Sequence, residues 1–251
     1  MQNSHMPLST WFWGAYLVTT QTPGQSALQF QRQLGISRYE TAFQMLHKLR
    51  AGMVRPERAA IGVQYPVEVD ETLVGGRTRG EGRGVHHKAT VVGAVEVRSR
   101  REGKPRKRMT YAGRLRLRLV PGRGADDLTS FVKENVAKGS VVRTDGWQGY
   151  DGLLKMGYLH KPVVLDGDPE LTDEHLPMIH RVFSNLKTWL RGTHHSVSHR
   201  HLQAYLNEYV FRFNRRFYPM TAFNSVLGLA AHAPSPTYAG LYSGEWIHPA
   251  A

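Results

Sequence analysis

Apolar residues recur at helical spacing along the first fifty positions of the chain. The stretch 10–17 fits a short buried helix because it gathers the aromatic residues Trp11, Phe12, Trp13 and Tyr16. Ser26 then offers an N-cap for an apolar stripe over 27–34. Ser37 offers a second N-cap, for a helix over 38–49. Two helices joined by a short glycine-containing turn form the helix-turn-helix pattern.

The middle of the chain alternates apolar and polar residues, as half-buried strands do. The candidate strands are 67–73, 90–97, 113–120 and 140–143. Helical spacing covers 126–137, then Leu176 to about Leu190 with Pro177 in the first turn, and last His199 to about Phe217 with Ser198 as cap. Strands first, then strands alternating with helices, indicate an α/β or α+β core.

Charge points to the partner of this fold. The 251 residues include 33 Lys plus Arg against 20 Asp plus Glu, a net charge of +13. Such a surplus favours a polyanion, with nucleic acid ahead of an anionic membrane. No apolar run approaches the roughly 20 residues of a spanning helix, so no membrane partner is expected. The chain has no cysteine, which excludes disulfides and thiolate zinc sites and is compatible with the cytoplasm.

Three residues suggest a metal site that acts on phosphate. Asp70 ends the strand-like stretch 66–70 and Asp145 ends 141–145, while His180 lies on the later predicted helix. Carboxylates at strand ends suit divalent ions that activate an attacking oxygen and stabilise a leaving one. Alternation places Glu68 and Asp70 on one face of their strand, opposite its valines. For His180 alone, an ordinary surface histidine remains the alternative.

The segment after Asp145 carries its own candidate chemistry. Gly146 and Gly149 allow a sharp turn and close approach to a substrate. Trp147 and Tyr150 offer flat faces on which an unpaired base can rest. The alternative interpretation is a plain turn formed by Asp-Gly.

These segments, in this order, resemble the ISXO-type transposases of bacterial insertion sequences. The motifs are Val67-Glu-Val-Asp-Glu-Thr-Leu-Val-Gly-Gly76, Thr144-Asp-Gly-Trp-Gln-Gly-Tyr150, Ile179-His-Arg-Val-Phe-Ser-Asn-Leu-Lys187, Gly192-Thr-His-His195, Tyr205-Leu-Asn-Glu208 and Phe211-Arg-Phe-Asn-Arg215. The resemblance covers about residues 8–235. It implies an RNase H-like mixed sheet with flanking helices, carrying an Asp-Asp-Glu triad and a trailing lysine.

Carried over by position, the resemblance makes Asp70 and Asp145 metal-binding residues and Lys187 a DNA-contacting lysine. The last triad place falls on His180, where the superfamily usually has Glu. An imidazole nitrogen suits Mn²⁺ better than Mg²⁺, and either ion is the implied cofactor. Asn185 and Glu208 are fallback candidates for the third ligand. Glu208 also fits a helix ion pair with Arg212 at i+4.

The resemblance also implies a domain order. We expect a helix-turn-helix module at 1–60, an RNase H-like catalytic domain at 61–235 and a tail at 236–251. The branch commonly begins with a four-cysteine zinc ribbon, so this cysteine-free chain resembles a truncated member. His194, His195, His199 and His201 invite a zinc-site interpretation, but without cysteines we prefer histidines near the DNA or capping the last helix.

DNA contacts are expected from several basic segments. Residues 98–108 hold seven basic residues against one acid at a predicted hairpin tip, a suitable clamp for a phosphate backbone. The strand after it alternates leucines with Arg114, Arg116 and Arg118. In the helix-turn-helix, nearby Arg50, Arg55 and Arg58 favour DNA over mere packing. The candidate DNA-binding residues are Arg38, Lys48, Arg101, Arg106, Lys107, Arg108, Trp147 and Lys187.

The implied function is metal-dependent cleavage at transposon ends followed by strand transfer into target DNA. The expected partners are the inverted repeats of the element ends, target DNA and further copies of the chain assembled on DNA, in the cytoplasm at the nucleoid. Two alternatives remain open. One is a catalytically inactive DNA-binding remnant, and the other is a metal-dependent nuclease without strand transfer.

Overall fold

The computed structural model describes residues 4–55, 59–75, 88–99, 109–164, 174–195, 197–233, 236–243 and 246. Backbone contacts divide the chain into two compact units. One comprises Met1–Pro56 together with Trp189–Ala251, and the other is Glu57–Thr188. The ranges predicted from the sequence follow a different division, because residues 189–235 group here with the amino-terminal helices.

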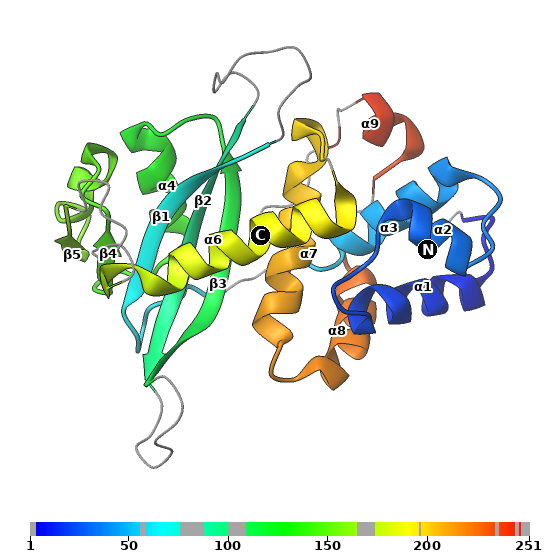
Figure 1. Ribbon diagram of the computed structural model, residues 1–251, viewed down its shortest axis with the longest axis horizontal. Helices are drawn as coiled ribbons and strands as arrows, with labels where there is room; N and C mark the ends of the chain where they lie inside the picture. The colour runs from blue at the N-terminus through cyan, green and yellow to red at the C-terminus, as the bar shows by residue number, and fades with distance from the viewer. Residues whose placement is uncertain are drawn as a thin grey trace. The chain divides into compact units, whose positions relative to one another are not determined.

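The first unit is helical (Figure 1). Its helices are α1 (Leu8–Thr20), α2 (Ala27–Gln33), α3 (Tyr39–Ala51), α7 (Leu202–Arg215), α8 (Ala222–Ala230) and α9 (Tyr238–Ser243). Short turns of tighter or wider helix cover Leu190–His194, His199–His201 and Pro219–Thr221. Trp11, Phe30, Leu46, Phe211 and Val226 share one apolar core. Helices from both ends of the chain therefore pack into the same apolar core, which makes them one unit.

The predicted amino-terminal helices are confirmed, with two corrections. In α1, Trp11 is buried but Phe12, Trp13 and Tyr16 are exposed, so most of the aromatic residues were wrongly expected to be buried. The helix instead buries a narrow stripe that includes Ala15 and Val18. Residues on the other sides of a surface helix face water.

The amino-terminal caps of α2 and α3 differ from each other. Ser26 caps α2 as predicted, accepting a hydrogen bond from Gln29 N at 3.2 Å. Ser37 does not cap α3, because Arg38 occupies the N-cap position and no side chain supplies a capping bond. Gly35 in the connecting turn has φ 63°, a left-handed conformation that glycine adopts readily.

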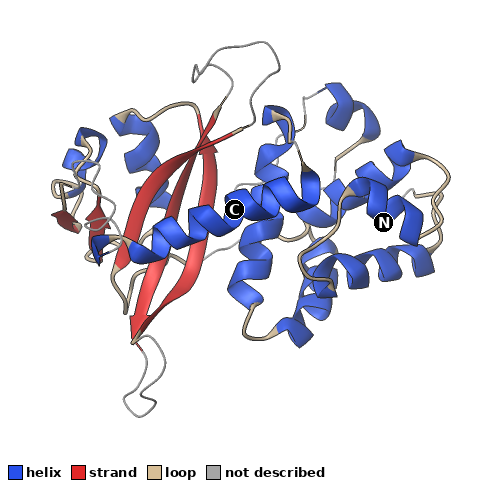
Figure 2. Cartoon of the chain, viewed as in Figure 1, coloured by secondary structure: helices blue, strands red, loops and turns tan. Residues whose placement is uncertain are grey.

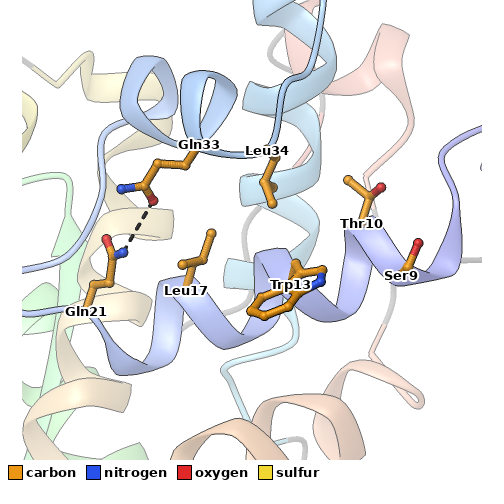
Figure 3. Close-up of a pocket in the computed structure, with 7 residues that line it drawn as sticks. All are labelled: Ser9, Thr10, Trp13, Leu17, Gln21, Gln33 and Leu34. Carbon is orange, nitrogen blue, oxygen red and sulfur yellow. Dashed lines mark hydrogen bonds between the residues drawn. The ribbon is translucent and has the colours of Figure 1, made fainter.

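A pocket of about 590 Å³ lies in this unit. Gln21 Nε2 donates to Gln33 Oε1 at 3.3 Å at one end of it (Figure 3). Its lining residues are Ser9, Thr10, Trp13, Leu17, Gln21, Gln33 and Leu34. The pocket therefore lies between α1 and the end of α2, with uncharged polar groups as well as apolar ones.

The second unit contains a mixed sheet (Figure 2). Its strands are β1 (Val67–Val74), β2 (Ala89–Ser99), β3 (Thr110–Val120), β4 (Val141–Thr144) and β5 (Leu159–Pro162). Their order is β3-β2-β1-β4-β5. β1–β2 and β2–β3 pair antiparallel, whereas β1–β4 and β4–β5 pair parallel. Four strands match the prediction, and β5 was missed because its short sequence, Leu-His-Lys-Pro, shows no apolar alternation.

Helices cover both faces of this sheet. Val67 and Val69 share a core with Leu128 and Phe131 of α4 (Ala125–Asn135). The opposite face carries α6 (Pro177–Trp189), which begins at the predicted proline. The last long predicted helix forms as α7, but Ser198 makes no capping bond and precedes a short turn instead. Among the described residues, no helix is both long and apolar enough to cross a membrane.

Gly93 of β2 lets α6 lie against the sheet. It pairs with Asp70 in the β1–β2 ladder. A β-carbon at this position would lie 2.9 Å from Ile179 Cδ1 and 2.9 Å from Phe183 Cε1. Because such distances are shorter than real contacts, the missing side chain is what allows the helix to pack beside Asp70.

Candidate metal centre

The register of β1 and β4 brings the two predicted aspartates together. Glu68 pairs with Arg143 across the parallel ladder, so two residues further Asp70 lies opposite Asp145. Asp145 directly follows β4, as predicted. Asp70 does not end its strand, because β1 continues to Val74 alongside β2. The site therefore lies at the end of β4 and half-way along β1.

A third carboxylate joins the two aspartates. Within the described part of the chain, Asp70, Glu71 and Asp145 form the group that could hold a metal ion, with ligand atoms within 4.8 Å of one another. Glu71 is not among the ligands predicted from the sequence, because strand alternation assigns neighbouring residues to opposite faces. The only sequence signal was its position inside the first motif.

Glu71 already has strong partners. Its Oε1 accepts hydrogen bonds from Arg123 Nε at 2.7 Å and from Arg123 Nη2. Its Oε2 accepts one from Tyr150 Oη at 2.6 Å. Charge-assisted bonds of this kind compete with a metal for the same lone pairs. Glu71 is therefore held by the protein, while Asp70 and Asp145 have oxygen atoms to offer.

Trp147 lies beside this network. The Arg123 guanidinium lies 4.8 Å from the centre of its ring, and Trp147 Nε1 donates to Arg123 O at 3.1 Å. Asp145 Oδ1 accepts a hydrogen bond from Trp147 N at 3.0 Å, and Gly146 has φ 78°. The predicted Asp-Gly turn is thus present, and the same turn holds Asp145 beside Asp70.

His180 reaches the site from α6. Its Nε2 lies 3.2 Å from Asp70 Oδ2, and its side chain is 37% exposed. The structure thus places His180 beside Asp70, whereas the carboxylates that lie within 4.8 Å of one another in the described part of the chain are those of Asp70, Glu71 and Asp145. The role of His180 as third ligand stays a prediction. Lys187 is partly buried and Asn185 is exposed, both further along α6. Seven residues of helix (187 minus 180) span about 10 Å, so Lys187 lies two turns beyond His180.

Burial dominates the electrostatics of this site. Burial, together with the neighbouring charges of Glu71 and Asp145, raises the pKa of Asp70 to about 8. Burial likewise raises the pKa of Tyr150 well above its usual value. Acidic groups crowded in this way are stabilised by a cation. The donor set of carboxylate oxygens fits a hard divalent ion such as Mg²⁺ or Mn²⁺, with an imidazole nitrogen at its edge.

Glu208, a fallback candidate for the third metal ligand, lies in the helical unit and pairs with Arg50. Its Oε2 lies 2.8 Å from Arg50 Nε in the helical unit, and both side chains are fully buried. The i+4 partner Arg212 instead donates to the backbone oxygens of Val18 and Gln21. The expected Glu208–Arg212 pair is therefore wrong. Arg50 is also not part of a basic surface, because none of it is exposed.

The remaining DNA-contact predictions divide into three groups. Arg38 is exposed and Lys48 is partly buried at the two ends of α3. Arg101, Arg106, Lys107 and Arg108 lie outside the described residues, as does Arg58. The β3 arginines are bound by the protein itself.

The arginines of β3 form hydrogen bonds and ion pairs within the protein. Arg114 Nη2 lies 2.9 Å from Glu96 Oε1, and Arg118 pairs with Glu134. Arg116 Nη2 donates to Ala59 O at 2.9 Å. The alternation of leucine and arginine along β3 therefore reflects internal ion pairing as much as a basic face.

The histidine cluster packs against aromatic rings. His194 lies 4.7 Å from the ring of Trp189 and 4.6 Å from that of Tyr205. His201 occupies the N-cap position of α7 but makes no side-chain capping bond. Among the described residues these histidines do not form a group close enough to hold a metal.

A comparison with family models decides the class of this protein. The model described as ISXO2-like transposase domain matches residues 62–214, more than half of the chain. The chain belongs to this transposase family. No curated protein and no solved structure gives a significant match. The mixed five-stranded sheet with flanking helices agrees with an RNase H-like transposase domain, so the predicted fold class is confirmed. The matched range of the transposase domain contains Asp70, Asp145 and His180.

Proposed function

We propose that this transposase cleaves DNA at the ends of a mobile element and joins the freed 3′-hydroxyl to target DNA. The observation that carries the proposal is the convergence of Asp70, Glu71 and Asp145 within 4.8 Å, with His180 3.2 Å from Asp70. Family membership supports the same reaction class. DNA at the nucleoid of the cytoplasm, and further copies of the chain assembled on it, are the proposed partners.

Each side chain has a role in this proposal. Asp70, Asp145 and His180 hold the cation, Mg²⁺ or Mn²⁺. When bound, the ion supplies activation of the attacking oxygen and charge stabilisation at the leaving oxygen. Arg123 and Tyr150 hold the Glu71 side chain in place beside the ligands. Lys187 contacts a DNA phosphate, as a point charge.

Two displacements at phosphorus make up the reaction. In the first, water attacks the scissile phosphodiester, the bond to the 3′-oxygen breaks, and that oxygen leaves as a hydroxyl. In the second, this hydroxyl attacks a target phosphodiester and releases a target 3′-hydroxyl. One phosphodiester replaces another in the second step, so the chain needs no other energy source. Trp147, 36% exposed, offers a face to an unpaired base next to the break.

Removal of a ligand tests the reaction. Asp145→Ala is expected to lower Mn²⁺-dependent cleavage and strand transfer at least about a thousandfold, because losing a metal-bound carboxylate removes several kcal/mol of transition-state stabilisation. Asp151→Ala is the matched control, since this exposed aspartate lies six residues away in η1 (Gln148–Leu153). Unchanged activity in Asp145→Ala would refute the mechanism.

The same assay separates the two alternatives. Joined products require strand transfer, cleaved but never joined products indicate a nuclease, and binding without cleavage in either Mg²⁺ or Mn²⁺ indicates an inactive remnant. Position 180 favours Mn²⁺ as the first ion to test, because imidazole nitrogen is a softer donor than carboxylate oxygen.

A further inference from the structure

A second acidic residue of β1, Glu68, is engaged with α6 instead of with the candidate metal centre. Glu68 Oε2 accepts hydrogen bonds from Met178 N at 2.7 Å and from Ile179 N at 2.9 Å. The side chain is fully buried. These contacts join residues 110 and 111 positions apart in the sequence. The carboxylate thus links the strand that carries Asp70 to the helix that carries His180.

The start of α6 explains why a carboxylate is suited to this place. The first N–H groups of a helix have no partner within the helix, and its amino-terminal end attracts negative charge. Pro177, the first residue of α6, has no N–H. Met178 and Ile179 therefore provide the first available donors, and Glu68 accepts from both. The helix's own bonding begins next, with His180 N donating to Leu176 O at 3.3 Å.

The spacing on each element connects Glu68 with the metal centre. Glu68 and Asp70 are two residues apart on one strand and point to the same face. Met178 and His180 are two residues apart in the first turn of α6. With Met178 N fixed on Glu68, His180 Nε2 lies 3.2 Å from Asp70 Oδ2. One strand, β1, therefore carries Asp70, a proposed metal ligand. Two residues earlier it carries Glu68, which bonds to the helix that bears His180.

The surroundings favour a fixed arrangement. Arg143 is the backbone neighbour of Glu68 in the β1–β4 ladder, and Arg181 lies in the first turns of α6. Glu68 Oε1 is buried and has no hydrogen-bond partner among the residues that the structure describes. A buried carboxylate with one oxygen unbonded is costly and is stabilised mainly by the two amides of α6.

We propose that Glu68 is a positioning residue that anchors the start of α6 and thereby holds His180 against Asp70. The inference rests on the proposed function, because it gives the anchor a purpose in metal binding. Residues that orient metal ligands commonly change metal affinity by about 10–100-fold when they are lost.

Backbone hydrogen exchange in the metal-free chain tests the anchor. Glu68→Ala removes both bonds, so the amides of Met178 and Ile179 should exchange about tenfold faster or more. The amide of Leu186, later in α6, should change much less. Glu68→Gln keeps an acceptor oxygen and should restore most of the protection. Glu96→Ala removes another buried carboxylate of the sheet and reports general destabilisation.

Manganese binding tests the purpose of the anchor. Free Mn²⁺ is measured by its electron paramagnetic resonance signal in titrations of four chains, namely unsubstituted, Glu68→Ala, His180→Ala and the double variant. Glu68→Ala should weaken binding by about tenfold in the unsubstituted background. In the His180→Ala background, Glu68→Ala should weaken Mn²⁺ binding by less than about twofold, because the side chain that Glu68 positions has been removed.

The outcomes separate the two proposals. Equal losses in both backgrounds would overturn the positioning role, because Glu68 would then act independently of His180. Unchanged exchange at Met178 and Ile179 would overturn the anchor itself. If the unsubstituted chain does not bind Mn²⁺, the proposed function and the metal role of Glu68 both fail, while the exchange result still decides whether Glu68 holds the helix.

Discussion

Asp70 and Asp145 have different surroundings, although they lie at one site. Asp70 is 6% exposed and its pKa is raised to about 8 by burial. Asp145 is partly exposed, and one of its oxygens accepts a backbone hydrogen bond within its own turn. A cation bound between them would compensate charge that the folded chain otherwise places in a poorly solvated position.

Metal binding should therefore stabilise the folded chain. At Mn²⁺ concentrations about 100 times the dissociation constant, the unfolding free energy should rise by about 2.7 kcal/mol. Asp145→Asn should remove most of this gain, because it takes away one anionic ligand while keeping an oxygen for the Trp147 amide. Thermal unfolding with and without Mn²⁺ measures the effect. Asp151→Asn is the control, and an undiminished gain in Asp145→Asn would contradict the ligand assignment.

At the scale of elements, the site depends on how closely α6 approaches the sheet. Gly93 makes room for the helix beside Asp70, and Glu68 bonds to its first turn. Neither contact is local in sequence. The helix itself follows from apolar spacing behind Pro177, but its position over β1 follows from these two contacts.

Filling the space at Gly93 should disturb both stability and the site. The β-carbon of Gly93→Ala would lie 2.9 Å from three apolar side chains, so the substitution should cost about 1–3 kcal/mol of unfolding free energy. Weaker Mn²⁺ binding should accompany it, since α6 carries His180. Urea unfolding and Mn²⁺ titration provide the two measurements.

Gly152→Ala is the matched control for Gly93. A β-carbon at Gly152 would meet Thr129 Cγ2 at 3.8 Å, an ordinary contact. Equal effects of the two substitutions would show that close approach of α6 is not what Gly93 provides.

At the scale of the whole molecule, two units hold different kinds of buried charge. The helical unit buries the Arg50–Glu208 pair with His194 nearby, and burial lowers the pKa of His194 to about 3. The positive charge of Arg50 contributes to this lowering of the His194 pKa. The sheet unit buries Glu96, whose bonds to Arg114 and Arg98 hold its pKa at about 2 although burial alone would raise it.

Acid should destabilise the helical unit through His194. In the unfolded chain this histidine gains a proton as the pH falls below 6.5, whereas in the folded chain it stays neutral until about pH 3. Its contribution to stability is therefore complete above about pH 6.5 and is lost progressively towards pH 3. His194→Phe keeps an aromatic ring beside Trp189 and should show a smaller loss of stability between pH 7 and 4.5.

Urea unfolding at the two pH values measures this loss. His232→Phe, at an exposed position of the same unit, is the control. Identical pH dependence in His194→Phe and the unsubstituted chain would show that the His194 imidazole does not account for the acid sensitivity.

Local pattern was enough to predict most elements and the two aspartates. Alternation and helical spacing arise from neighbours two to four residues apart, so the strands and helices could be located from the chain alone. The motif order predicted Asp70, Asp145 and His180 as one site. Glu71 could not be predicted as part of the site from local pattern, because its partners, Arg123 and Tyr150, lie 52 and 79 residues away in the sequence.

What the chain alone determined is most of the helices and strands and the transposase family, because short-range periodicity and motifs encode them. The metal ligands it only predicted. Tertiary structure decided which charges remain available. It buried Arg50 against Glu208, 158 residues away, and bound Arg114 to Glu96. It also bonded Glu68 to the start of α6. A charged side chain that is buried needs a partner of opposite charge or a hydrogen-bonding group, because burial removes its water. Which partner lies close enough depends on how segments distant in sequence pack together.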